Sequence, residues 1–317
     1  MKKYYTVLMA GGIGERFKPL STPEFPKQFH DLLGAGKSLL ELTYNRFAQF
    51  IPTENIFIAT NSRYKSIIQS QLKSFPSNQL LLETAKRNTA PCILYSALKI
   101  SQKDPDGILI IAPTDHKIDN NAEFIDNLKT AAGFCENNEA LVTLGITPDR
   151  PRTEYGYINY KMSDNLFKNV LKFTEKPNII KATEFLKSGN YLWNAGIFIC
   201  SVQSILNAFK EYQPTMFKLF NTGINFWDAN EEFNFQKNIY PKSENISIDF
   251  GIMEHANNIY VHPTNFGWSD LGSWKSLYDI LPKNKNNVAK VEGFEIKIDI
   301  DQKLNIYSNE KIVLQLD

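Results

Sequence analysis

The chain has 317 residues, 43% of them hydrophobic, which is enough for one large domain or two smaller ones with a full core. Its 35 basic and 34 acidic residues give a formal charge of +1, so charge offers no reason to expect nucleic acid or an anionic membrane as a partner. The three cysteines are far apart, which favours reduced thiols of a cytoplasmic protein over disulfides or a zinc site. We expect neither a secretory signal nor a membrane span, because no apolar run is long enough.

Predicted strands and helices alternate through the first half of the chain. Continuous apolar runs predict strands at 4–10, 56–60, 107–112 and 141–146. Apolar residues at helical spacing predict amphipathic helices over 40–51, 90–98 and 124–135. This alternation predicts an α/β fold with an open, mostly parallel sheet. Ligands of such sheets bind beyond the carboxyl ends of the strands.

Beyond about residue 150 the pattern becomes irregular and aromatic. We expect strands near 155–160, 168–174 and 196–200 in a mixed sheet that carries an acceptor site, and mainly helix over 203–245. The polar run 282–287 is typical of a linker, and the tail after it alternates like a small β unit. We therefore divide the chain into a domain over 1–282 and a short C-terminal β segment over 283–317.

A glycine-rich loop follows the first strand. Gly11, Gly12 and Gly14 lack a Cβ, so their backbone N–H groups can approach an anion closely. Two cations, Arg16 and Lys27, come soon after, which indicates a polyphosphate site. The spacing matches neither a P-loop nor a dinucleotide fingerprint, so a Rossmann oxidoreductase is excluded. The glycines taken alone remain equally compatible with an ordinary turn.

The loop together with seven later motifs resembles the start and core of the sugar nucleotidyltransferases, most closely the mannose-1-phosphate guanylyltransferases (GDP-mannose pyrophosphorylases). The resemblance covers about residues 4–280. The motifs are Gly11-Gly-Ile-Gly-Glu-Arg16 with Pro26-Lys-Gln-Phe29, Arg87-Asn-Thr-Ala-Pro91, Pro113-Thr-Asp-His116, Tyr155-Gly-Tyr-Ile158, Thr174-Glu-Lys-Pro177, Trp193-Asn-Ala-Gly-Ile-Phe198, Ser247-Ile-Asp-Phe-Gly-Ile-Met-Glu254 and Trp268-Ser-Asp-Leu-Gly-Ser-Trp274.

The resemblance implies a Rossmann-like (GT-A-type) catalytic domain that makes GDP-mannose and pyrophosphate from GTP and mannose 1-phosphate with Mg²⁺. It also implies that the tail begins a left-handed β-helix, which ends here earlier than the family pattern, as in a short or truncated form. The family often forms homodimers, although no interface can be identified from the sequence.

Four residues are the expected catalytic set. By resemblance, Arg16 contacts the β and γ phosphates, Lys27 lies beside the α-phosphate, and Asp115 and Asp270 hold one Mg²⁺. Oxygen ligands suit this ion. Simpler structural roles remain open for both carboxylates, because Asp115 could cap the helix that follows and Asp270 could form an Asx turn. We expect His116 to be an orienting or structural residue.

The family resemblance assigns recognition of the nucleotide base to two segments. These are the loop after the first strand and the segment that precedes the second predicted helix. Asn and Thr side chains can match a purine edge, but nothing in these residue types alone specifies guanine. Asn88 and Thr89 could also cap the helix. The expected nucleotide-binding residues are Ala10, Gly11, Gly12, Gly14, Arg16, Lys27, Glu83, Asn88, Thr89 and Asp115.

The sugar phosphate is assigned to the second half of the chain. Glu175 and Asn194 offer hydrogen bonds to hydroxyl groups, and Lys176 offers a charge to the phosphate. Gly156 can expose backbone groups to the sugar ring. Asp249 is a further candidate that could equally cap the helix after it. Ala195 stands where the family commonly has Ser, which leaves the details of sugar recognition open.

Two other functions remain open. The first is a nucleotidyltransferase for another sugar 1-phosphate or another base. The second is a non-catalytic regulatory subunit that binds GDP-mannose. A pseudoenzyme is expected to lose one of the four catalytic residues, and this chain has all four.

Overall fold

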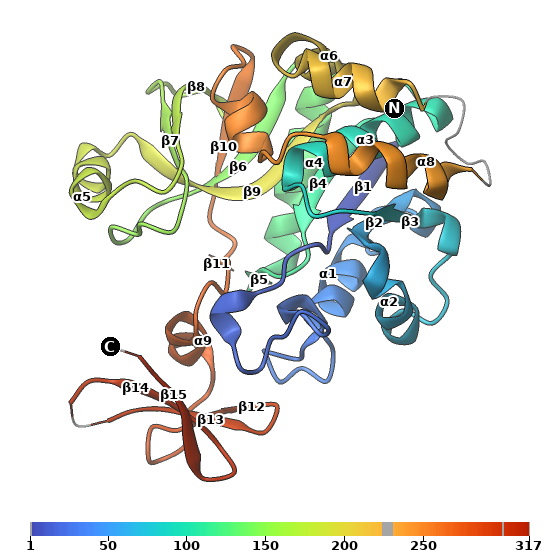
Figure 1. Cartoon of the computed structure of the whole chain (residues 1–317). Helices are drawn as coiled ribbons and strands as arrows, with labels where there is room; N and C mark the ends of the chain where they lie inside the picture. The colour runs from blue at the N-terminus through green and yellow to red at the C-terminus, as the bar shows by residue number, and fades with distance from the viewer. Residues whose placement is uncertain (1, 224–230, 300, 317) are drawn as a thin grey trace.

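The computed structural model describes residues 2–223, 231–299 and 301–316, and its largest element is a nine-stranded sheet of order β3-β2-β1-β4-β9-β6-β10-β8-β7 (Figure 1). The prediction of an α/β fold is confirmed. The strands are β1 (Tyr4–Met9), β2 (Ile56–Asn61), β3 (Leu80–Glu83), β4 (Ile108–Pro113), β6 (Leu141–Ile146), β7 (Tyr157–Tyr160), β8 (Lys168–Thr174), β9 (Tyr191–Ser201) and β10 (Ile259–Thr264).

The sheet is parallel in one half and mixed in the other. Strands β3, β2, β1 and β4 are parallel neighbours, as the alternating pattern predicts. Strand β9 then runs antiparallel between β4 and β6, and β7 and β8 pair antiparallel beyond β10. The expectation of a mostly parallel sheet therefore holds only for the first half, because β9 enters the centre of the sheet in the opposite direction.

Helices cover both faces of the sheet (Figure 1). One apolar core packs α3, α6 and α7 against the sheet, and a second packs α1, α2 and α4 against the opposite face. The expected helical segment 203–245 contains α6, α7 and α8, and its part at 224–230 lies outside the described residues. The helices are α1 (Leu39–Phe47), α2 (Lys65–Gln71), α3 (Thr89–Lys103), α4 (Asn121–Asn137), α5 (Ile179–Ser188), α6 (Val202–Tyr212), α7 (Pro214–Asn221), α8 (Glu232–Ile239) and α9 (Trp274–Ile280).

The three cysteines of the chain are buried. Cys92, Cys135 and Cys200 are buried and free, as small apolar residues of a core commonly are. Among the described helices, none combines the length and the apolar character that crossing a membrane requires.

The tail forms a separate antiparallel sheet of four strands. These are β12 (Ala289–Val291), β13 (Phe294–Ile298), β14 (Leu304–Ser308) and β15 (Lys311–Leu316), and each pairs with the next one along the chain. The expected start of a left-handed β-helix is not confirmed. A β-helix stacks parallel coils, whereas tight turns reverse the chain here after each strand.

A third apolar core connects this small sheet to the loop after β1. We call residues 11–33 the signature loop. Phe17, Leu20 and Leu32 of that loop share a core with Trp274 of α9 and with strands β12–β14. The rings of Phe17 and Trp274 lie 5.5 Å apart, and the Trp274 indole N–H donates to the Lys18 carbonyl at 3.0 Å. The signature loop is thus enclosed between the large sheet and the C-terminal sheet.

Candidate active site

The signature loop leaves the carboxyl end of β1 and closes on its own later residues. Gly14 has φ +68°, and a Cβ added there would lie 2.4 Å from the Lys27 Cβ, so only glycine fits. The Gln28 side-chain amide donates to the carbonyls of Ala10 and Gly12, both at 3.1 Å. These bonds fix the glycine-rich turn beside Lys27.

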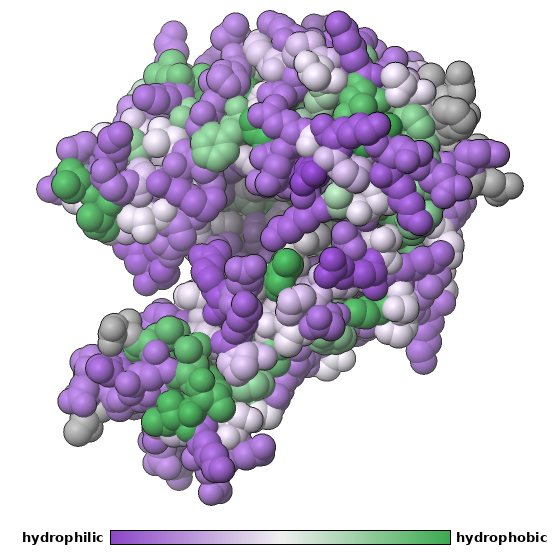
Figure 2. All heavy atoms as spheres, viewed as in Figure 1, coloured by the Kyte–Doolittle hydropathy of each residue, from purple (hydrophilic) through white to green (hydrophobic). Residues whose placement is uncertain are grey.

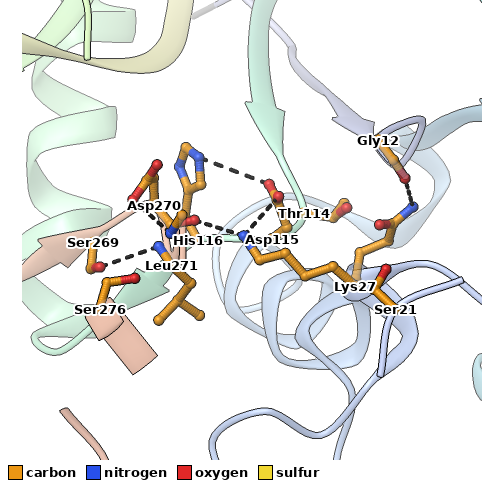
Figure 3. Close-up of polar contacts among 12 residues, drawn as sticks. Gly12, Ser21, Lys27, Thr114, Asp115, His116, Ser269, Asp270, Leu271 and Ser276 are labelled. Carbon is orange, nitrogen blue, oxygen red and sulfur yellow. Dashed lines mark hydrogen bonds and ion pairs between the residues drawn. The ribbon is translucent and has the colours of Figure 1, made fainter. Parts of the chain in front are cut away.

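The Lys27 ammonium is the centre of the site. The residue is only 4% exposed, and its Nζ donates to Asp115 Oδ2 at 3.0 Å and to the Asp270 backbone carbonyl at 2.7 Å. Figure 3 shows the side chain extending from the signature loop toward both aspartates. A buried charge requires partners of this kind, because desolvation without them is costly. Lys27 therefore links three segments that are distant in the sequence.

The two aspartates reach this point from adjacent loops. Asp115 follows β4, and Asp270 follows β11 (Trp268–Ser269). A short antiparallel pairing of β11 with β5 (Lys117–Ile118) holds the two loops together. Asn120 caps helix α4, so the alternative role of Asp115 as that cap is wrong.

Asp270 is held by hydrogen bonds to one carboxylate oxygen. The Gly272 N–H and the Tyr155 hydroxyl both donate to Oδ1 at 2.9 Å. The bond from Gly272 confirms the Asx-turn alternative, which does not conflict with a role in the site. The Tyr155 hydroxyl remains a donor, since burial and the neighbouring Asp270 carboxylate raise the pKa of Tyr155.

Electrostatics keep the Asp115 carboxylate ionised. Burial by itself would raise its pKa, but the Lys27 ammonium and His116 outweigh this and hold the pKa of Asp115 below its usual value. Burial lowers the pKa of His116. The Trp268 indole donates to His116 Nδ1 at 3.1 Å, so the neutral ring carries its proton on Nε2, which lies 3.8 Å from Asp115 Oδ1. His116 is therefore an orienting neighbour of the carboxylate.

A cavity of about 530 Å³ lies beyond the carboxyl ends of β1, β3 and β4, within the size range of ligand pockets. Figure 2 shows a polar-rimmed hollow on this side of the molecule. The lining includes Gly11, Gly12, Glu83, Asn88, Thr89 and Asp115 of the predicted nucleotide residues. Ile13 and Arg87, which lie in the two segments assigned to the base, also line it, as do Gln28, Arg63 and Asn245, which were not predicted.

Glu83 is the buried acid of this cavity. Burial raises its pKa to about 7, although hydrogen bonds from the Tyr240 hydroxyl and the Cys92 thiol lower it. Its Oε2 lies 3.3 Å from where a Cβ on Gly11 would be, so the carboxylate faces the glycine-rich turn.

The capping alternative for the segment after Glu83 is also correct. The Asn88 side chain accepts the Thr89 N–H and caps α3. The Thr89 hydroxyl accepts the Ile248 N–H at 2.9 Å, which ties the cavity wall to a segment far along the chain.

The predicted sugar residues form a second polar cluster around β9. Asn194 Nδ2 donates to Asp249 Oδ1 at 2.9 Å, and Asn194 Oδ1 accepts the Thr143 hydroxyl at 3.0 Å. A Cβ on Gly156 would lie 2.4 Å from Glu175 Oε2, so the Glu175 carboxylate lies directly against the backbone at Gly156. Burial and the neighbouring Glu175 raise the pKa of Asp249 to about 6. The Asp249 side chain makes no cap for the helix that follows it.

Two predicted cations lie at the surface. Arg16 is exposed in a short 3₁₀ turn and makes no hydrogen bond or ion pair with the described residues. Lys176 is largely exposed and pairs with its neighbour Glu175. The structure therefore leaves their predicted roles untested.

Sequence reasoning missed the residues that hold others in place. Tyr240, Tyr155 and Thr143 each donate a hydroxyl to a predicted site residue from a distant segment. Tyr155 belongs to one of the motifs, and its place in that motif could have identified it as a site residue. Tyr240 gave no such signal, because it lies in none of the motifs and only falls within the expected helical segment 203–245.

We predict that Tyr240→Phe costs more stability at high pH than at low pH. At about pH 8 the variant removes a donor to the ionised Glu83, a bond worth about 1.5–3 kcal/mol, whereas at about pH 5.5 the protonated acid loses a neutral bond worth about 0.5–1.5 kcal/mol. The variant also raises the pKa of Glu83 above 7, because the Tyr240 hydroxyl no longer stabilises the ionised form. The buried acid contributes stability at low pH, and this stability is lost as pH rises toward the pKa of Glu83 in the folded protein. In the variant this loss continues to a higher pH and is larger in total.

Denaturant unfolding of both proteins at the two pH values measures this difference. Tyr64→Phe is the control, since Tyr64 donates to the neutral carbonyl of Pro23 at 2.8 Å and its loss should cost the same at both pH values. An equal cost for Tyr240→Phe at the two pH values would refute the coupling.

Comparison with known proteins agrees with this geometry. A family model described as nucleotidyl transferase matches residues 5–287. The chain is 35% identical to mannose-1-phosphate guanylyltransferase RfbM of Salmonella typhimurium over 92% of its own length and 62% of the relative's. It is 33% identical to the xanthan biosynthesis protein XanB of Xanthomonas campestris, over 94% of this chain and 64% of XanB. The chain thus spans less than two thirds of the length of these curated relatives.

Two solved structures are also similar. A protein titled mannose-1-phosphate geranyltransferase from Thermus thermophilus superimposes with a TM-score of 0.79 at 30% identity, over 90% of this chain and 81% of that one. A protein titled mannose-6-phosphate isomerase from Helicobacter pylori gives a TM-score of 0.68 at 29% identity, over 84% and 99% of the two chains. With the family model spanning most of its length, the chain belongs to the nucleotidyl transferase family.

Proposed function

We propose that this chain transfers GMP from GTP to α-D-mannose 1-phosphate and releases GDP-mannose and pyrophosphate, with Mg²⁺. The observation that carries the proposal is the meeting of Lys27, Asp115 and the Asp270 loop. The nucleotide cavity extends to Asp115, and Tyr155 connects Asp270 to the polar cluster that begins at Gly156. A cation between two polar sites suits a reaction that joins two anionic phosphates.

The chemistry is an in-line phosphoryl transfer. A phosphate oxygen of mannose 1-phosphate attacks the α-phosphorus of GTP, and the bond from this phosphorus to the α–β bridging oxygen breaks, so pyrophosphate leaves with that oxygen. Negative charge grows on the leaving group. We assign Lys27 to the α-phosphate side and the exposed Arg16 to the β and γ phosphates, because fixed cations stabilise that charge.

Asp115 and Asp270 fit a Mg²⁺ ion. Mg²⁺ is commonly held by one or two carboxylates, with phosphates and water as its other ligands. The Asp115 side chain is 33% exposed, so it is accessible from the cavity while still paired with Lys27. When bound, the ion would neutralise phosphate charge. No cluster of three or more His, Cys, Asp or Glu side chains suited to a metal occurs among the described residues, so these two carboxylates would need phosphate or water oxygens as further ligands.

The base preference rests on Glu83. Guanine presents two adjacent donors on its Watson–Crick edge, and an ionised carboxylate only accepts hydrogen bonds. Glu83 lies in the cavity wall with its carboxylate toward Gly11, and the Tyr240 hydroxyl stabilises the ionised form. The names of the relatives support guanine and mannose more directly than these contacts do.

We predict that the purified protein converts GTP and mannose 1-phosphate to GDP-mannose and pyrophosphate when Mg²⁺ is present. A matrix of GTP, ATP, UTP and dTTP against mannose, glucose and galactose 1-phosphates, with pyrophosphate release as readout, tests this. Preference for another base or sugar would replace the assigned substrates and leave the reaction class intact. A protein that binds GDP-mannose but turns over no pair would instead be a regulatory subunit.

We also predict that Asp115→Asn and Asp270→Asn each reduce kcat by about a hundredfold or more, because each removes charge that would hold Mg²⁺. If both serve one ion, the double variant should be little slower than the slower single variant. Asp270→Asn should change stability little, whereas Asp115→Asn should lower it, because it removes the carboxylate that pairs with the buried Lys27 ammonium.

Kinetics over a Mg²⁺ titration and melting temperatures test this prediction. The matched control is Asp119→Asn, since Asp119 is an exposed aspartate of the same loop that pairs with Lys117. Normal activity of either single variant at limiting Mg²⁺ would remove that residue from the site.

A further inference from the structure

The C-terminal sheet contacts the signature loop through one acidic side chain. Glu292 Oε2 lies 2.5 Å from His30 Nδ1, and Glu292 Oε1 accepts the Asp31 N–H at 2.5 Å. Both carboxylate oxygens are thus used on two consecutive residues of the loop. The side chains are partly protected from solvent, at 7% exposure for His30 and 32% for Glu292.

Both ring nitrogens of His30 face oxygen acceptors. His30 Nε2 lies 3.0 Å from the Phe25 carbonyl, which can only accept a hydrogen bond. An ionised Glu292 can also only accept, so the two contacts are those that suit an imidazole ring with a donor on each nitrogen. Burial alone would raise the pKa of Glu292, but the bonds from His30 and Asp31 lower it overall, which agrees with the ionised form.

The clamped residues directly follow the turn that carries the site. Residues 27–29 form a short 3₁₀ turn, in which the His30 N–H donates to the Lys27 carbonyl at 3.1 Å. The Lys27 side chain reaches Asp115, and the Gln28 side chain holds the glycine-rich turn. His30 spans this turn, because its ring bonds to Phe25 on one side and to Glu292 on the other.

Glu292 lies in a tight turn that sets the direction of its side chain. Glu292 and Gly293 form the two-residue turn between β12 and β13, with φ +42° and +81°. Turns of this kind strongly favour Asn-Gly or Asp-Gly, and a glutamate at positive φ is unfavourable. The longer side chain of glutamate spans the distance to His30 and Asp31.

We propose that Glu292 is a positioning residue for the transfer reaction, through which the C-terminal sheet fixes the loop that carries Lys27. The proposal rests on the proposed function for its kinetic consequence, but the clamp itself can be tested without activity. Other contacts to the same loop come from the large sheet side, such as the bond from the Leu39 N–H to the His30 carbonyl at 3.1 Å. Glu292 supplies the charged contact from the opposite side.

The test variant is Glu292→Asn. Asparagine suits the turn better than glutamate but is too short to keep both bonds, so the hairpin is preserved while the clamp is lost. We expect kcat with GTP and mannose 1-phosphate to fall roughly tenfold to a hundredfold, as for a displaced catalytic group, with KM for GTP within about twofold. Glu292→Gln keeps the length and one acceptor, so its kcat should lie between those of wild type and Glu292→Asn.

The matched control is Glu310→Asn. Glu310 has φ +64° in the two-residue turn between β14 and β15 of the same sheet, and among the described residues it makes no hydrogen bond or ion pair with the signature loop. Its replacement should leave kcat unchanged. If the Glu292 variant were to lose activity only because the sheet loosens, the control would lose activity as well.

Amide hydrogen exchange gives a readout that needs no substrate. In Glu292→Asn we expect faster exchange at Phe29, His30 and Asp31, with strands β12–β15 still protected. A second variant, His30→Gln, approaches the pair from the loop, and the double variant should be no worse than the poorer single one. Unchanged loop exchange, wild-type kcat, or additive effects of the two substitutions would overturn the proposal. Absence of turnover in wild type would refute the assigned reaction alone, and exchange would still decide the clamp.

Discussion

The Lys27 ammonium is the interaction on which the rest of the site depends. It is buried, and its two bonds join the signature loop to the Asp115 carboxylate after β4 and to the Asp270 carbonyl after β11. A buried cation without such partners would be strongly unfavourable, so the three segments have to meet for the chain to fold in this way. The same requirement places a positive charge beside Asp115, which also lines the cavity beyond the carboxyl ends of β1, β3 and β4.

Support for this centre comes from both sides of the signature loop. On the side of the large sheet, the Gln28 side chain of the loop donates to the Ala10 carbonyl directly after β1, and the glycine required at position 14 sets the path of the glycine-rich turn. From the other side, the third apolar core encloses the loop against α9 and the C-terminal sheet, and Glu292 adds a charged contact. A displacement of a catalytic group by about 1 Å can strongly slow the chemical step. We therefore expect the support on both sides of the signature loop to affect the rate of transfer. The C-terminal sheet is therefore part of the scaffold of the site.

Much of this arrangement was predictable from local patterns. Apolar runs and helical spacing predicted β1, β2, β4 and β6 and helices α1, α3 and α4, but not β3 or α2. The family resemblance supplied Lys27, Asp115, Glu83 and Asn194 as candidate site residues. The patterns do not contain strand direction, so the antiparallel entry of β9 was missed. The alternating tail is compatible with hairpins or a β-helix, and the antiparallel pairing of consecutive strands through tight turns distinguishes them. Supporting residues such as Tyr240 escaped because their role arises from contacts between distant segments.

The most direct measurement is the kcat/KM of Lys27→Met for GTP and mannose 1-phosphate, beside its melting temperature. Methionine keeps an apolar chain of similar length and removes the ammonium, with its charge and its two donated hydrogen bonds. The account predicts a loss of about a hundredfold or more in kcat/KM in a protein that still folds. Lys99→Met is the comparison, because Lys99 is also buried and ion-paired, with Glu232, outside this site, and its loss should affect stability without a comparable loss of rate. A folded Lys27→Met protein with kcat/KM within about tenfold of wild type would contradict the central role assigned to this ammonium.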